Sequence, residues 1–513
     1  MTTTPNRYTN TRKNCIIRRL FLILFGLVWL APIHAADSPN ILFIAVDDLR
    51  PELGCYGKDF IVSPHIDRLA SSGMVFTRAY CQQAVCSPSR SSLMTGLRPD
   101  STKVWDLETH FRTAVPNVVT LGQHFKNNGY FVQGFGKIYH GGFDDEPTWS
   151  VPWQTPKAVR YALPENRETN QDLSSNAVTG QPSSASTENA KNNRRSKKSK
   201  GSRGPAFESA DVPDSTFQDG KVAEMAIAAL GQMSQRNEPF FLAVGFVKPH
   251  LPFVAPKKYW DLYDPASIQL ASNKFRPKNS PEYSVQPGGE LRNYRGIPDN
   301  SIPDDLARQL KHGYYACISY MDAQVGKLLD ELDRLDLRKN TIIVLWGDHG
   351  WKLGEHDAWC KHSNVENDVN APLILSVPNM ATAGRHTRAL VEFVDIYPTL
   401  SELAGLPLPL HLEGASFKRL LENPNRPWKT AAFSQYPRSQ DGGLMGYSMR
   451  TDRYRLTRWM DRNDHSRVVA MELFDHQTDP QENENLAGLT EHAALVEQLA
   501  TQLASGWKAA LPR

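Results

Sequence analysis

Hydrophobic residues along this chain fall into short continuous runs and into longer stretches with helical spacing. The continuous runs, which are typical of strands buried on both faces, lie at 41–46, 240–247 and 341–346, and two shorter strands are expected at 74–80 and 129–132. Apolar residues three and four apart predict helices over 63–73, 118–128, 216–235 and 304–335. This alternation of strands and helices predicts an α/β protein.

The amino-terminal segment follows neither pattern. The apolar run 20–30 is preceded by Arg12, Lys13, Arg18 and Arg19, and Ile33-His34-Ala35 then has the small residues of a signal-peptidase site. We expect 1–35 to be a signal peptide and the mature protein to be exported, either to a periplasm or to the outside of the cell. The run is short for a membrane span, so an uncleaved anchor is the lesser alternative.

A second segment, 165–205, is rich in Ser, Asn, Lys and Arg and has almost no large apolar residues. Such a composition cannot bury enough surface to fold, so we expect a disordered insertion. Its basic run could attract a polyanion, although charge runs are usually only solvated.

The formal net charge of +3 arises from these two segments. The amino-terminal 35 residues carry five cations, and seven more lie between Lys191 and Arg203. The remainder is net negative, which argues against a nucleic-acid-binding body.

Ionisable residues follow four of the predicted strands. In open α/β sheets, ligands bind at the carboxyl ends of the strands, so these residues are expected to share one site. Each alone has a simpler explanation, since Asp-Asp is commonly a solvated turn and a lone histidine is commonly a loop residue. The residues are Asp47 and Asp48, Lys137 and His140, Lys248 and His250, and Asp348 and His349.

The stretch Cys86-Ser87-Pro88-Ser89-Arg90 places a nucleophile at the start of a predicted helix. Five cysteines follow the signal segment, and an odd number leaves at least one thiol without a partner. Cys86 could pair with Cys81 in a small loop, or it could stand apart as the reactive group. The cations Arg90, Lys137 and Lys361 favour the second interpretation, because together they would face an oxyanion ester.

The acidic residues of this group suggest a bound cation. Asp47, Asp48 and Asp348 offer hard oxygen ligands, which suit Ca²⁺ or Mg²⁺. His349 leaves zinc or manganese open, although Cys86 lacks the partner spacing of a zinc thiolate site.

These residues resemble the formylglycine-dependent sulfatases. The motif at 86–90 with Leu93, Thr95 and Gly96 is similar to the family signature, in which the cysteine becomes formylglycine. The resemblance covers about 37–155, 238–262, 303–405 and 430–485, and it is strongest to the iduronate-2-sulfatase branch. It implies an alkaline-phosphatase-like α/β fold with a large, mostly parallel central sheet flanked by helices. The catalytic domain would span 36–430, and a smaller domain, 431–513, would hold an antiparallel sheet and a helix.

The resemblance also implies roles for the site residues. Ca²⁺ would be bound by Asp47, Asp48, modified Cys86, Asp348 and His349. The formylglycine and the sulfate would be held by Arg90, Lys137, His140, His250 and Lys361, with His250 preferred over His140 as the acid that protonates the leaving alcohol.

The implied activity is hydrolysis of sulfate esters, most specifically 2-O-sulfate of iduronate or related uronic acids in sulfated polysaccharides. The partners would be a sulfated glycan and, during maturation, a formylglycine-generating enzyme, with no nucleic acid and no stable membrane anchor. A sulfatase for another polysaccharide, a phosphoester or phosphonate hydrolase of the same fold, and a non-catalytic glycan binder are the alternatives.

Overall fold

The computed structural model describes residues 38–167, 203–440 and 443–512. The predicted signal peptide and positions 168–202 of the predicted insertion lie outside the described residues. At the margins of the insertion, Pro164–Asn166 forms a 3-10 helix and Arg203–Pro205 forms strand β5. Ordered structure therefore reaches a few residues further into 165–205 than the composition indicated.

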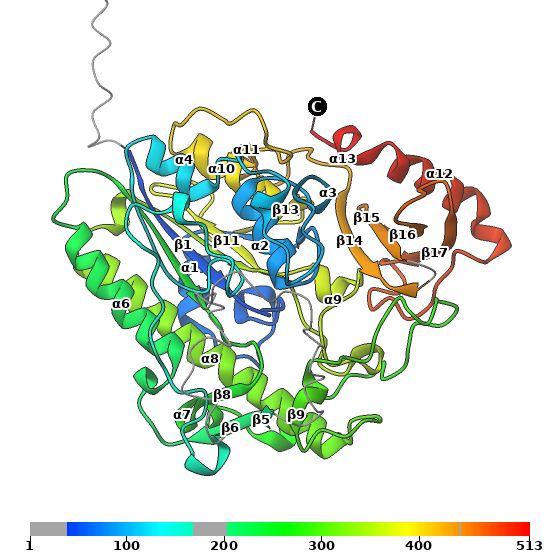
Figure 1. Cartoon of the computed structure of the whole chain (residues 1–513), viewed down its shortest axis with the longest axis horizontal. Coiled ribbons are helices and arrows are strands. Elements are labelled where there is room, and N and C mark those ends of the chain that lie inside the picture. The colour runs from blue at the N-terminus through cyan, green and yellow to red at the C-terminus, as the bar shows by residue number, and fades with distance from the viewer. Residues whose placement is uncertain (1–37, 168–202, 441–442, 513) are drawn as a thin grey trace, which may run out of the picture.

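A seven-stranded mixed sheet runs through the centre of the larger part of the molecule (Figure 1). Its order is β12-β2-β11-β10-β1-β7-β4, and the four strands from β10 to β4 are parallel to one another. The strands are β1 Asn40–Val46, β2 Met74–Phe76, β4 Phe131–Gly136, β7 Phe240–Phe246, β10 Thr341–Gly347, β11 Leu373–Ser376 and β12 Arg385–Thr387. The predicted α/β class with a mostly parallel sheet is confirmed.

The register of the parallel strands brings their carboxyl ends to one edge of the sheet. Val46 at the end of β1 is paired with Gly347 of β10 on one side and with Phe246 of β7 on the other. Gly136 at the end of β4 is paired with Gly245 of β7. The residues that follow these four strands are therefore neighbours in space, as the sequence predicted.

Both faces of the sheet are covered by helices. Successive side chains of β1 point to opposite faces and so enter two different cores. Leu42, Ile44 and Val46 join one hydrophobic core, and Ile41, Phe43 and Ala45 join the other. The first core is closed by α1 Pro64–Ser71, α6 Gln218–Met233 and α8 Asp304–Arg334. The second is closed by α2 Cys86–Thr95, α4 Leu121–Asn127 and α10 Ile396–Leu403. Helices predicted from spacing alone agree with α1, α4, α6 and α8 to within about three residues at either end.

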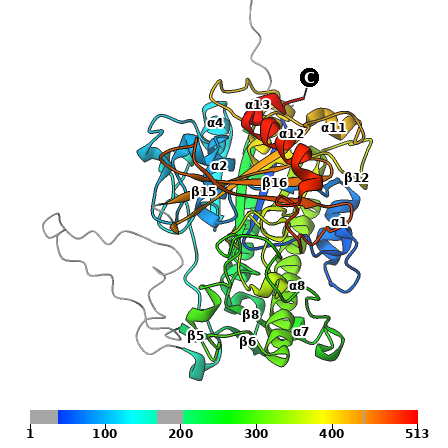
Figure 2. The same ribbon diagram turned by 90° about the vertical axis from the view of Figure 1, so that its right-hand side faces the viewer.

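The carboxyl-terminal part forms a separate four-stranded antiparallel sheet, as expected. Its strands are β14 Ala432–Arg438, β15 Leu444–Arg450, β16 Tyr454–Asp461 and β17 Val468–Asp475. Helix α12, Ala493–Ala504, lies across this sheet (Figure 2) and buries Val496 and Leu499 against its strands. None of the helices in the described residues is long and apolar enough to cross a membrane.

Three two-stranded sheets lie outside the central sheet in the described residues. Short strands β6 Phe207–Ala210 and β8 Phe253–Pro256 pair in parallel beside α7 Lys257–Trp260. Strand β3 Ala79–Tyr80 pairs with β13 Val391–Glu392, and β5 pairs with β9 Tyr294–Arg295.

Candidate active site

Cys86 is the first residue of helix α2 and faces the carboxyl edge of the central sheet. Every residue of α2 is buried, and the helix ends at Gly96, whose φ of 68° closes the last turn in the left-handed conformation. The hydroxyl of Ser89 donates to the backbone oxygen of Asp348. This bond ties the first turn of the helix to the end of β10, so residue 86 has a fixed position over the sheet.

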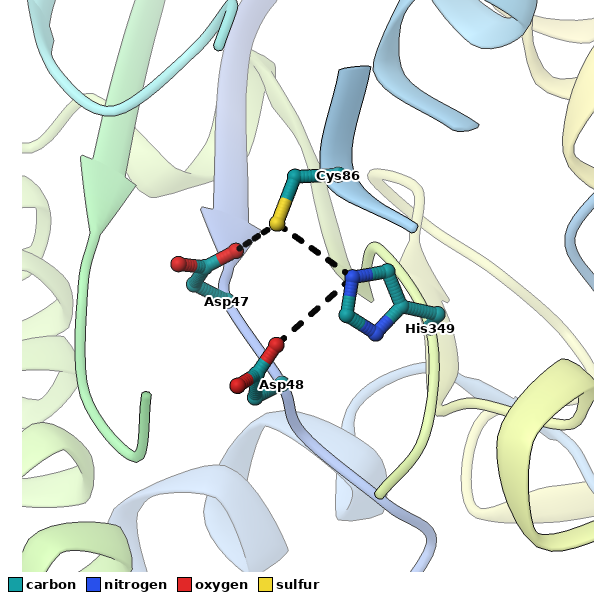
Figure 3. Close-up of side chains that lie close together, drawn as sticks. All are labelled: Asp47, Asp48, Cys86 and His349. Carbon is teal, nitrogen blue, oxygen red and sulfur yellow. Dashed lines mark hydrogen bonds and ion pairs between the residues drawn. The ribbon is translucent and has the colours of Figure 1, made fainter. Parts of the chain in front are cut away.

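Three ionisable side chains surround the Cys86 sulfur, and Figure 3 shows two of them, Asp47 and His349. Sγ lies 3.4 Å from Asp47 Oδ1, 3.4 Å from His349 Nε2 and 3.6 Å from Lys137 Nζ. These residues follow β1, β10 and β4, three of the four strands whose ends the sequence predicted to converge. Among the cysteines that the structure describes there is no disulfide, so the possible pair of Cys86 with Cys81 is not formed.

The backbone at the end of β1 turns both aspartates toward this point. Asp48 has a φ of 57°, a left-handed conformation that Asp tolerates better than most residues. Its amide donates to Asp348 Oδ1 at 3.0 Å, and its carbonyl accepts from the Tyr314 hydroxyl at 2.7 Å. Asp47 and Asp48 are at most 1% exposed, so the solvated-turn explanation is excluded.

Arg90 is buried beneath the site and connects three strand ends. Its Nε lies 2.8 Å from Asp348 Oδ2, its Nη2 lies 3.3 Å from Asp47 Oδ1, and its Nη1 donates to the carbonyls that follow β4. The side chain is completely inaccessible to solvent. In this arrangement Arg90 compensates the charge of the carboxylates and sets the spacing of the strands.

Two lysines bring positive charge to the carboxylates that follow β1. Lys137 forms an ion pair with Asp47, and Lys361 Nζ lies 3.1 Å from both carboxylate oxygens of Asp48. Burial alone would raise the pKa of Asp47, but the charges of Lys137, His250 and Arg90 hold it well below its usual range. Burial also opposes ionisation of the lysines, yet the carboxylates raise the pKa of Lys361 above its ordinary value. The pKa of Lys137 is raised in the same way, so both lysines remain charged.

The two predicted histidines have different environments. His250 Nε2 lies 3.1 Å from Glu290 Oε1 and 3.9 Å from Asp48 Oδ2. Burial would lower the pKa of His250, but these two carboxylates outweigh it and raise the pKa. His140 is in the wall of a cavity of about 700 Å³, where burial and then Lys137 lower its pKa to about 3. No hydrogen-bond partner in the described residues reaches the buried Nδ1 of His140. Of these two histidines, His250 is the one whose pKa is raised, so it is the better placed of the two to carry a proton.

Lys248, the other ionisable residue after β7, points away from this group. Its Nζ donates to the backbone oxygens of His250 and Pro252. It supports the turn that carries His250 and has no contact with Cys86 among the described residues.

The sequence reasoning missed Glu290. Its carboxylate lies 2.8 Å from Lys361 Nζ and 3.1 Å from His250 Nε2, between two residues that the sequence did predict. Glu290 comes from a loop of irregular structure between α7 and α8, and no motif or periodic pattern marks it.

The buried acidic residues fit a divalent cation. Ligand atoms of Asp47, Asp48, Cys86 and His349 all lie within 4.8 Å of one another. The two aspartates supply hard oxygen ligands, which agrees with the prediction of Ca²⁺. Asp348 lies alongside, with Oδ1 at 3.5 Å from His349 Nε2, but Asp48 and Arg90 already use its two oxygens. Its role as a direct ligand stays a prediction.

Models of known protein families match both the larger and the carboxyl-terminal part of the chain. A model described as sulfatase matches residues 39–406, and one described as N-sulphoglucosamine sulphohydrolase, C-terminal, matches residues 354–508. Iduronate 2-sulfatase of Mus musculus is 36% identical to this chain, over 91% of this chain and 94% of that protein.

Two solved structures share the fold at low sequence identity. One is a protein in complex with its substrate D-glucosamine-2-N,6-O-disulfate, with a TM-score of 0.69, 20% identity, and coverage of 92% of this chain and 98% of the other. The other is the phosphonate monoester hydrolase of Agrobacterium radiobacter, with a TM-score of 0.69, 22% identity, and coverage of 91% and 95%. The fold alone therefore does not distinguish an enzyme that acts on sulfate esters from one that acts on phosphonate esters.

Proposed function

Because this chain belongs to the sulfatase family and is a sulfuric ester hydrolase, we propose that it removes 2-O-sulfate from iduronate or related uronic acid units of sulfated polysaccharides. The observation that carries this substrate class is the similarity to mouse iduronate 2-sulfatase, which extends over 94% of that protein. The extent of this similarity favours a shared substrate class and not only a shared fold.

We infer further that Cys86 acts as formylglycine, made by a formylglycine-generating enzyme during maturation. Burial and the Asp47 carboxylate raise the pKa of the Cys86 thiol well above its usual value, against the opposing charges of Lys137 and Lys361. A thiol that remains protonated is a poor nucleophile. The site is therefore better suited to an oxygen nucleophile at residue 86 than to a cysteine thiolate.

When present, a hydrated formylglycine would supply one hydroxyl that attacks sulfur and a second whose proton loss releases the sulfate, while Ca²⁺ would draw charge from these oxygens. Asp47, Asp48 and His349, with Asp348 beside them, would hold the cation. Lys137 and Lys361 would offset charge on the sulfate oxygens. His250 would give its Nε2 proton to the sugar oxygen as the sulfur–oxygen bond breaks.

The leading test is a panel of defined sulfated disaccharides, assayed for sulfate release with wild-type protein and with Cys86→Ala. We expect preference for 2-O-sulfated uronates and loss of all turnover in the variant. Mass spectrometry of the peptide that contains residue 86 reports the fraction converted to formylglycine. A fully converted enzyme that releases no sulfate from any 2-O-sulfated uronate would contradict the proposal.

The same panel separates the alternatives. A phosphonate or phosphate hydrolase of this fold, favoured by the similarity to the phosphonate monoester hydrolase structure, would prefer the phosphorus ester over the matched sulfate. A non-catalytic binder would carry unmodified Cys86 in native protein. Export after cleavage near residue 35, and the domain boundary near residue 430, remain part of the proposal.

A further inference from the structure

Glu290 lies directly against two groups that the proposed reaction uses. Its Oε2 is 2.8 Å from Lys361 Nζ and its Oε1 is 3.1 Å from His250 Nε2, so one carboxylate spans both side chains. The Glu290 side chain is 18% exposed. A carboxylate in this position affects whatever His250 and Lys361 do.

The loop that carries Glu290 is held in place by neighbouring segments. Gly288 has a φ of 98°, and a Cβ at this position would lie 2.7 Å from the backbone oxygen of Trp359. The Cys360 thiol donates to the Gln286 carbonyl at 3.4 Å, and Arg438 donates to the Ser284 carbonyl at 3.0 Å. The Glu290 loop is therefore packed against the segment that carries Lys361, and the carboxylate is not a freely moving surface group.

Both nitrogens of the His250 ring face an acceptor. Nδ1 lies 2.7 Å from the carbonyl oxygen of Leu251, and since a carbonyl only accepts, Nδ1 carries a proton. Nε2 is the nitrogen that faces Glu290 and the site. The Leu251 carbonyl and the Glu290 carboxylate thus fix the ring plane from opposite ends.

We propose that Glu290 is a positioning residue for departure of the sugar, whose carboxylate holds the His250 ring so that its Nε2 proton lies where the leaving oxygen can take it. The proton moves from His250 Nε2 to the leaving oxygen as the sulfur–oxygen bond breaks, and Glu290 itself exchanges no proton. Glu290 thereby acts on the step that depends on the leaving group. The inference rests on the proposed function, because it requires a sulfate ester with a sugar alcohol as the leaving group.

The dependence on the leaving group gives a direct test. A sugar alkoxide needs a proton to leave, whereas 4-nitrophenolate is acidic enough to leave without one. For Glu290→Gln we expect kcat on the best disaccharide of the panel to fall about 10- to 100-fold, the usual cost of losing a group that orients an active-site residue. On 4-nitrophenyl sulfate we expect kcat to fall less than about threefold, since no proton transfer is needed.

Two further variants make the result specific. Glu282→Gln alters an exposed carboxylate of the same loop, 95% exposed, and should leave both substrates unaffected. In a His250→Ala background, Glu290→Gln should add less than about threefold on the disaccharide, because residues that act through one another are not additive. Thermal unfolding of each variant checks that the fold is retained.

Equal losses on both substrates would overturn the proposal in favour of a structural role, and an unchanged kcat on the disaccharide would also overturn it. The proposed function is tested separately, by which disaccharide wild-type protein prefers. A preference for a sugar sulfate other than 2-O-sulfated uronate would contradict that function, and the comparison for Glu290 would still be made on the preferred sugar.

Discussion

The Arg438 guanidinium, at the end of β14, donates from Nη2 to the backbone oxygen of His362 at 2.7 Å. The same guanidinium donates to the carbonyls of Tyr283 and Ser284. One buried side chain of the carboxyl-terminal sheet therefore holds both the Lys361 segment and the Glu290 loop. Through this residue the smaller sheet contributes to the geometry of the site without contacting Cys86.

Replacing Arg438 by Met should lower activity and stability together. The carbonyl oxygens of Tyr283, Ser284 and His362 would lose this donor, and a buried acceptor without a partner costs about 1–3 kcal/mol. We expect the free energy of unfolding, measured with urea, to fall by about 3 kcal/mol, and KM for the disaccharide to rise because Lys361 and Glu290 are less well placed. Arg467→Met removes an arginine whose side chain is 53% exposed in the same part of the chain and should change neither quantity. Unchanged KM in Arg438→Met would disprove the link between the small sheet and the site.

Removing divalent cations should inactivate and destabilise the enzyme. Asp47, Asp48 and Asp348 are at most 1% exposed, and buried carboxylates in such proximity are stabilised by a bound cation. A ligand at 100 times its Kd stabilises the folded state by about 2.7 kcal/mol. We expect a chelator to lower the Tm and abolish sulfate release, Ca²⁺ to restore both, and Mg²⁺ to restore less. Asp48→Asn should reduce the shift in Tm, and a chelated wild-type enzyme with unaltered Tm would contradict a structural calcium site.

The convergence of the strand ends was open to prediction because of how β-sheets are built. Four apolar runs each ended in ionisable residues, and parallel strands with helical connections place their carboxyl ends at one edge. The shared position of Asp47, Asp348 and Lys137 at this edge follows directly from that argument. The helix start at Cys86 was also accessible, because Pro88 marks the first turn of a helix.

The contributions of Glu290 and Arg438 could not be found in the same way. Each acts through contacts between segments that are far apart in the chain and that belong to no repeating pattern. Glu290 reaches Lys361 only because Gly288 lets its loop pass close to Trp359, and this packing has no local signal in the sequence. The sequence likewise suggested that Arg90 would face the substrate, whereas the structure shows its guanidinium enclosed by Asp47, Asp348 and backbone carbonyls.

The ion pair of Arg50 with Glu355 should make stability depend on acid pH. Burial would raise the pKa of Glu355, but Arg50, at 3.0 Å, lowers it from 4.5 to about 2. Since the folded-state pKa is the lower one, the stabilisation is complete above pH 4.5 and is lost as the pH falls toward 2. The size of this contribution is about 3 kcal/mol.

The check is urea unfolding of wild-type protein and Glu355→Gln at several pH values. The difference between the two should be largest near neutral pH and should shrink as the pH is lowered through the range from 4.5 to about 2. Asp330→Asn is the matched control, because the ion pair of Asp330 with Arg68 is 61% exposed on the carboxylate side and surface pairs contribute little. A difference that does not vary with pH would show that Glu355 acts through packing alone.

Gly288 and Gly289 offer a comparison of two adjacent positions in the Glu290 loop. A Cβ at Gly288 would meet the Trp359 carbonyl oxygen at 2.7 Å and would sit at a φ of 98°, whereas a Cβ at Gly289 would have no atom within 4 Å. Gly288→Ala must therefore push the loop away from the Lys361 segment, at a cost of about 1–3 kcal/mol. Gly289→Ala has room for the added methyl group.

We expect Gly288→Ala to lower kcat/KM on the disaccharide at least as much as Glu290→Gln does, because the displaced loop carries Glu290 away from His250 and Lys361. Gly289→Ala should stay within about twofold of wild type, since substitutions without strain or lost contacts have small effects. Crystals of the two variants would show directly whether the distance from Glu290 to Lys361 increases only in the first. If both substitutions were harmless, the loop would not be the rigid support that places the carboxylate.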